Sequence, residues 1–120
     1  MLNRAVRMLS ISMFILGLST PAFAHSHPTK MSPDKAETVS APSVVSVEFS
    51  EALEPKFSSL TLTDDKDNVV SKAASVVDPS DAKHMTLALP TLAPGVYTVK
   101  WVTTALDGHH LEGKYNFTVK

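Results

Sequence analysis

The chain of 120 residues contains no cysteine. Without cysteine there are no disulfide bonds and no thiolate metal ligands, so stability must come from packing, and a metal must be held by nitrogen, oxygen or thioether ligands. Aromatic residues make up only 7% of the chain, and no stripe of basic residues is present. We therefore expect no nucleic-acid binding.

The first 24 residues have the features of a secretory signal peptide. A short basic segment with Arg4 and Arg7 precedes an apolar run, which ends at the A-x-A pattern of residues 22–24. The run is too short for a permanent transmembrane helix, which needs about 20 residues. We expect cleavage after residue 24, export to the periplasm, and no membrane span in the mature protein.

The predicted mature segment, residues 25–120, is long enough for one small domain with its own core. Its nine lysines stand against twelve aspartates and glutamates, which gives a net charge of −3 when histidine is neutral. We expect a monomer.

Apolar and polar residues alternate along several short segments of this domain, at a period typical of half-buried strands. Turn signals such as Pro94-Gly95 separate them at intervals of roughly 8–12 residues. The pattern predicts an antiparallel β-sandwich of six or seven strands without helices, with the Tyr97 hydroxyl bonded to a nearby turn. The positions expected on the buried faces are Val45, Val47, Phe49, Phe57, Leu60, Leu62, Met85, Leu87, Leu89, Tyr97, Val99, Trp101, Thr103, Tyr115, Phe117 and Val119.

The sequence AHSHP, residues 24–28, places a histidine directly after the expected cut. His25 would then offer a free amine, with a pKa of about 8 in model compounds, as well as its imidazole. An amine and a ring nitrogen on one residue form a chelate that favours Cu(II) first and Ni(II) second. His27 adds a third possible nitrogen, and protonation of such ligands should weaken binding as the pH falls.

A second group of candidate ligands lies in the sequence LDGHH, residues 106–110. In an extended chain Asp107 and His109 project to the same face, and Gly108 lets the backbone bend. Asp-Gly is also an ordinary turn signal, so the pair could be structural. His110 is expected to point away from His109, and His84 is expected to be an exposed polar residue.

Two other interpretations of the terminal histidines stay open. They could be a chance polar start to the mature chain. Alternatively, residues 25–27 could bind Cu(II) alone through the amine, two deprotonated backbone amides and the His27 imidazole, with Pro28 falling after the amides needed. That tripeptide mode needs neither Asp107 nor His109, so mutation of these residues separates the two modes.

The chain resembles the CopC-type periplasmic copper-resistance family (PcoC- or YobA-like) over essentially all of residues 25–120. The resemblance rests on the ordered set HSHP, SPDKAETVSAP, VSVEFSEAL, LAPGVYTVKW and LDGHHLEGKYNFTVK. It implies a small antiparallel Greek-key β-sandwich, Ig-like or cupredoxin-like, of about seven strands. It also implies one Cu(II) per chain, bound by His25, Asp107 and His109, with His27 recruited in members that begin H-x-H.

The family resemblance further implies a role in copper sequestration or delivery, with a CopD-type inner-membrane protein as a partner, and no enzymatic activity. Some members hold Cu(I) in a methionine-rich loop in mid-chain. The corresponding region here, roughly residues 60–85, has no cluster of thioethers, so we expect a single Cu(II) site. The alternatives are a copper-dependent oxidative enzyme with an N-terminal histidine brace and a metal-free β-sandwich interaction module.

Overall fold

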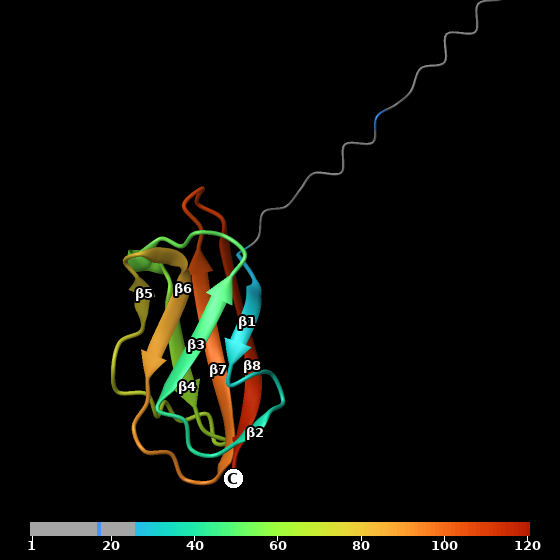
Figure 1. Cartoon of the computed structure of the whole chain (residues 1–120), viewed down its shortest axis with the longest axis vertical. Coiled ribbons are helices and arrows are strands. Elements are labelled where there is room, and N and C mark those ends of the chain that lie inside the picture. The colour runs from blue at the N-terminus through green and yellow to red at the C-terminus, as the bar shows by residue number, and fades with distance from the viewer. Residues whose placement is uncertain (1–16, 18–25) are drawn as a thin grey trace, which may run out of the picture.

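A computed structural model describes residue 17 and residues 26–120, and over residues 26–120 the chain folds into two packed β-sheets (Figure 1). One sheet has the strand order β1-β3-β6-β5 and the other β2-β8-β7-β4. The rest of the expected signal peptide and His25 lie outside the described residues. The elements are β1 (Pro28–Ser32), β2 (Thr38–Val39), β3 (Val44–Phe49), the 3-10 turn η1 (Pro55–Phe57), β4 (Ser59–Thr63), β5 (Val76–Asp78), β6 (Asp81–Ala88), β7 (Gly95–Thr104) and β8 (His110–Val119).

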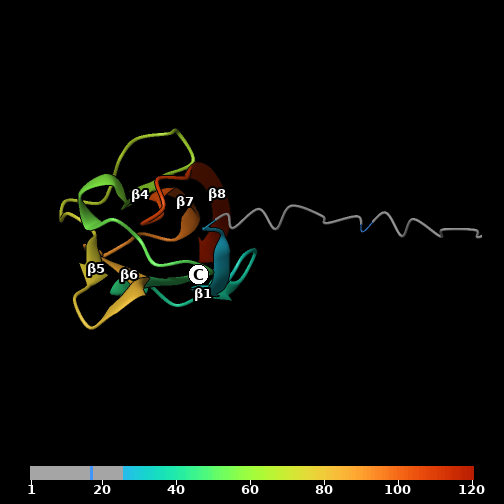
Figure 2. The same cartoon turned by 90° about the horizontal axis from the view of Figure 1, so that it is seen from above.

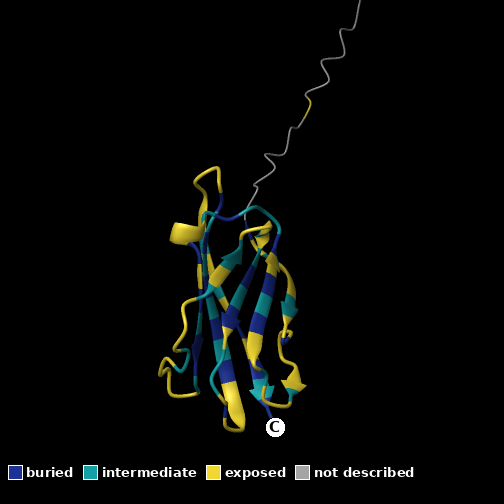
Figure 3. Ribbon diagram, turned by 60° about the vertical axis from the view of Figure 1, so that its left-hand side comes forward, coloured by how far each residue is buried: buried dark blue, intermediate teal, exposed yellow. Residues whose placement is uncertain are grey.

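The core lies between the two sheets and is built from the alternating positions of the strands. Figure 3 shows buried and exposed residues following one another along them. Phe49 of β3 packs edge-on against Trp101 of β7, with ring centroids 5.9 Å apart. The predicted alternation is confirmed in four strands, whose buried residues include Val45, Val47, Phe49, Met85, Leu87, Tyr97, Val99, Trp101, Thr103, Tyr115, Phe117 and Val119.

Strands β7 and β8 form the longest hairpin of the structure, paired from Gly95 opposite Val119 to Thr104 opposite His110. Near its start the Tyr97 hydroxyl donates a 2.7 Å hydrogen bond to the Ala93 carbonyl, as predicted from the turn before it. Within the described residues, no helix is long and apolar enough to cross a membrane.

The β-sandwich prediction is confirmed, with three differences in detail. The described residues form eight strands rather than about seven, and β2 pairs with β8 in parallel rather than antiparallel fashion. Phe57 was expected in the core but is 63% exposed. Pro55 begins the η1 turn, which resets the alternation, so that Leu60 and Leu62 of β4 enter the core while Phe57 does not.

Replacing phenylalanine by alanine should affect the free energy of unfolding very differently at a buried and at an exposed position. We expect Phe117→Ala, at a fully buried site, to lower the free energy of unfolding by about 3–5 kcal/mol. Phe57→Ala should change it by no more than about 0.5 kcal/mol, because that ring remains exposed to water. Urea denaturation followed by Trp101 fluorescence measures both, and equal losses would contradict the observed burial.

Candidate metal centre

The turn between β7 and β8, residues 105–109, is closed by main-chain hydrogen bonds. The Ala105 amide donates to the His109 carbonyl and the Gly108 amide donates to the Ala105 carbonyl, each over 2.9 Å. Gly108 has a φ of 91°, a conformation that glycine adopts without the steric cost of a Cβ atom. The D-G dipeptide therefore forms the tip of a hairpin and not a continuation of the strand.

Both oxygens of the Asp107 carboxylate accept hydrogen bonds from His109. Oδ1 accepts from the main-chain amide over 3.0 Å, and Oδ2 lies 2.9 Å from Nδ1 of the ring. These bonds, that of the main-chain amide first, lower the pKa of the Asp107 carboxyl below its ordinary value. The two side chains were expected together because of an extended chain, but an Asx-type turn brings them together.

The Asp107 contact determines how the His109 ring would meet a metal ion. With Nδ1 directed at the carboxylate, the ring carries its proton on Nδ1, so Nε2 is the nitrogen that could bind a metal ion. Both side chains are about half exposed. The pair can therefore act as a carboxylate–histidine unit for a cation that arrives from solvent.

The beginning of β1 lies at the same end of the sandwich as this turn (Figures 1 and 2). Ser26 is fully buried, and its hydroxyl lies 2.8 Å from the hydroxyl of Thr103, near the end of β7. The Thr103 hydroxyl also contacts the Ser26 carbonyl at 3.1 Å. The residue that follows position 25 is thus fixed beside the strand that leads into the Asp107–His109 turn.

His27 is exposed and lies against the residue that follows β3. Its main-chain amide donates to the Ser50 hydroxyl over 3.2 Å, and its Nδ1 lies 3.2 Å from the same hydroxyl. Within the described residues, no group of three histidine, aspartate or glutamate side chains is placed to hold a metal ion. A centre at this end of the sandwich requires ligands from outside that set, and the prediction takes them from His25.

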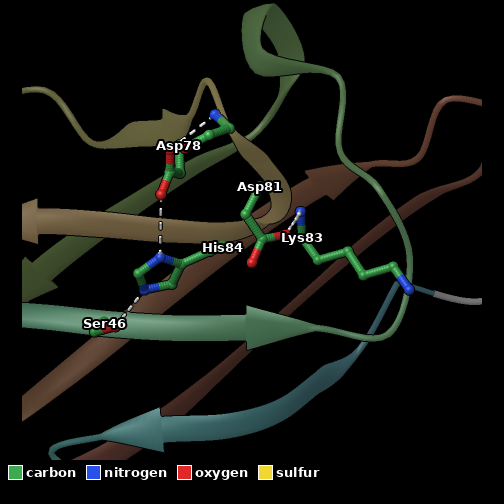
Figure 4. Close-up of polar contacts among 6 residues, drawn as sticks. Ser46, Asp78, Asp81, Lys83 and His84 are labelled. Carbon is green, nitrogen blue, oxygen red and sulfur yellow. Dashed lines mark hydrogen bonds and ion pairs between the residues drawn. The ribbon is translucent and has the colours of Figure 1, made fainter.

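The other two histidines have structural contacts, of which Figure 4 shows those of His84. His84 of β6 reaches across the outer face of its sheet, with Nε2 2.5 Å from the Ser46 hydroxyl and Nδ1 3.8 Å from the Asp78 carboxylate. The expectation that His84 is exposed was wrong: only 28% of its side chain is accessible, because its neighbouring strands cover the ring. His110 is exposed, and its Nδ1 contacts the Thr104 hydroxyl at 3.2 Å.

The CopC domain model matches residues 28–120, which include every strand and the hairpin turn just described. The chain belongs to the CopC family. It is 32% identical to Protein YobA of Escherichia coli K12 over 92% of each chain. It is 34% identical to Copper resistance protein C of Escherichia coli, over 88% of this chain and 90% of that one.

Among solved structures, CopC from Methylosinus trichosporium OB3b superposes with a TM-score of 0.75 at 35% identity, over 80% of this chain and 94% of that chain. This similarity agrees with the predicted sandwich fold. Several of the curated relatives are named as copper resistance or copper transport proteins, and those names agree with the predicted non-enzymatic role. The chain is accordingly a member of a family of copper resistance proteins.

The role of Asp107 in shaping the turn can be tested without metal. Asp107→Ala removes both acceptors for His109, so we expect the His109 amide to exchange with solvent at least about tenfold faster. The free energy of unfolding should change by less than about 1 kcal/mol, because the side chain is exposed. NMR-detected hydrogen exchange measures the first effect and urea denaturation the second. An unchanged exchange rate would show that the turn does not depend on the carboxylate.

Proposed function

We propose that this protein binds Cu(II) in the periplasm and sequesters it or delivers it to a CopD-type inner-membrane protein. Copper is the cargo, one ion per chain, and the protein acts as a monomer. The observation that carries this proposal is the attachment of buried Ser26 to Thr103, which holds Ser26 at the end of the sandwich that bears the Asp107–His109 turn.

The ligands follow from this placement and from the expected cut after residue 24. His25 supplies its terminal amine and its imidazole, and His109 supplies Nε2. His27 is a further candidate nitrogen, although its contacts with Ser50 would have to change. Because both oxygens of Asp107 already accept bonds from His109, its better supported role is to orient the ring, and direct coordination through a remaining lone pair is the alternative.

The donor set suits Cu(II) better than Cu(I). Nitrogen and oxygen ligands favour Cu(II), whereas Cu(I) is held by soft sulfur ligands. Met85 lies in mid-chain but is fully buried in the core, and Met31 is partly buried against the same core. Neither thioether is part of an exposed cluster, which supports a single site for the oxidised ion.

Two neighbouring histidines provide a matched test of the ligand assignment. We expect His109→Ala to weaken Cu(II) binding by at least about 10–100-fold, the loss typical of a damaged metal site. His110→Ala should leave the affinity within about twofold, because that ring contacts Thr104 instead. Titration calorimetry against a competing chelator measures both. Equal affinities for His109→Ala and the parent protein would rule out this site.

The free amine can be tested separately from the histidine ring. A mature protein that retains Ala24 before His25 keeps every side chain but converts the amine into an amide. We expect a loss of Cu(II) affinity of about tenfold or more, since one nitrogen of the chelate is removed. Intact mass spectrometry confirms each terminus. Unchanged affinity in the extended protein would show that cleavage after residue 24 does not create a ligand.

A further inference from the structure

Two copper-binding modes were considered for the terminal residues: the tripeptide mode and the mode that also uses the Asp107–His109 turn. Contacts of Ser26 and His27 in the structure favour the second. In the tripeptide mode, Cu(II) lies in a plane formed by the amine of residue 25, the amide nitrogens of Ser26 and His27, and the His27 imidazole. Both amides must lose their protons to solvent, and the metal must reach nitrogens on three successive residues. Each of these requirements conflicts with a contact of the described chain.

The first conflict is at His27. Its main-chain nitrogen and its Nδ1 lie 3.2 Å from one and the same atom, the hydroxyl oxygen of Ser50. That hydroxyl accepts from the amide and can donate to the ring, so it spans the two nitrogens between which the tripeptide mode would place copper. The Ser50 amide also donates to the His27 carbonyl over 2.9 Å. Ser50 therefore contacts His27 at its amide, its ring and its carbonyl, and these contacts favour the protonated form of the His27 amide.

The second conflict is at Ser26, which is fully buried together with Thr103. If the Thr103 hydroxyl donates to the Ser26 carbonyl, the Ser26 hydroxyl can donate to Thr103, and both polar groups are satisfied by one reciprocal pair. Tripeptide binding would have to draw Ser26 out into solvent and break this pair, after which the Thr103 hydroxyl would keep only its 3.3 Å contact with the Leu111 carbonyl. The net loss of one such hydrogen bond costs about 0.5–1.5 kcal/mol.

We propose that Ser50 and Thr103, the tail clamp, select the copper-binding mode by excluding the tripeptide chelate from the folded protein. This inference rests on the proposed function. Consecutive Cα atoms are about 3.8 Å apart, so a clamp on Ser26 and His27 limits how far residue 25 can lie from the end of the sandwich that bears the Asp107–His109 turn. Ser50 and Thr103 are positioning residues, because they act on the ligands without binding the metal.

The test compares the processed parent protein with Ser50→Ala, Thr103→Val and the double variant, each loaded with one equivalent of Cu(II). Visible absorption and electron paramagnetic resonance spectra are compared with those of the synthetic peptide HSHPTK, which can adopt the tripeptide mode and lacks Asp107, His109 and the tail clamp. We expect the spectrum of the parent protein to differ from that of the peptide. The spectrum of the double variant should shift towards the peptide spectrum. In the double variant, His109→Ala should change the affinity by less than about twofold, against at least about tenfold in the parent.

Two matched controls separate mode selection from general damage. Thr63→Val removes another buried threonine hydroxyl, one that has no hydrogen-bond partner in the described structure, and should keep the parent spectrum. Ser46→Ala removes a hydroxyl from β3 that contacts His84 and should also keep it. If Thr103→Val does not fold, Ser50→Ala alone must still shift the spectrum and speed exchange of the His27 amide.

The outcomes distinguish the clamp from the proposed function. A parent spectrum identical to that of the peptide, with no effect of His109→Ala, would overturn both the proposed site and the clamp. A parent spectrum that depends on His109, together with clamp variants that keep it unchanged, would overturn the clamp alone. A shift towards the peptide spectrum in the clamp variants but not in the controls supports the inference.

Discussion

The hydrogen-bonded pair of Ser26 and Thr103 is the constraint on which the arrangement of the candidate centre depends. The two residues are 77 positions apart in the chain, and both are fully buried. Their hydroxyls bond to each other, and the Thr103 hydroxyl also lies 3.3 Å from the Leu111 carbonyl, so separating the pair would cost about 0.5–1.5 kcal/mol per hydrogen bond lost. Residue 26 is therefore joined to β7 at the end of the sandwich where the hairpin turns.

The hairpin carries the other half of the candidate centre, and its stability comes from the core. Strands β7 and β8 bury alternate residues, Trp101 and Phe117 among them, and their ten-residue pairing continues to the residues that flank the turn. The turn itself needs little from the core, because Asp107 and His109 bond to each other and Gly108 takes the positive φ. A preformed carboxylate–histidine pair on a rigid hairpin can bind a metal with little reorganisation.

Much of the fold was predictable because strand alternation is a local signal that burial confirms, as in Val45, Val47 and Phe49. The prediction was wrong for Phe57, where a 3-10 turn interrupts the alternation, and for the parallel pairing of β2 with β8, which no local pattern encodes. His84 was taken for an exposed residue because Ser46 lies 38 positions away and on another strand. Contacts between strands distant in sequence are what local patterns omit.

The sequence by itself determined the half-buried strands and the hairpin turn at Asp-Gly, because each is encoded within a few neighbouring residues. Only the tertiary structure decided that Ser26 is buried against Thr103 and that His27 lies against Ser50. Those contacts exist because β1 pairs with β3 while β7 lies in the opposite sheet, which brings distant hydroxyls to one end of the sandwich. The sequence indicates which residues are candidate ligands, and only the packing of the strands decides which of them lie near one another.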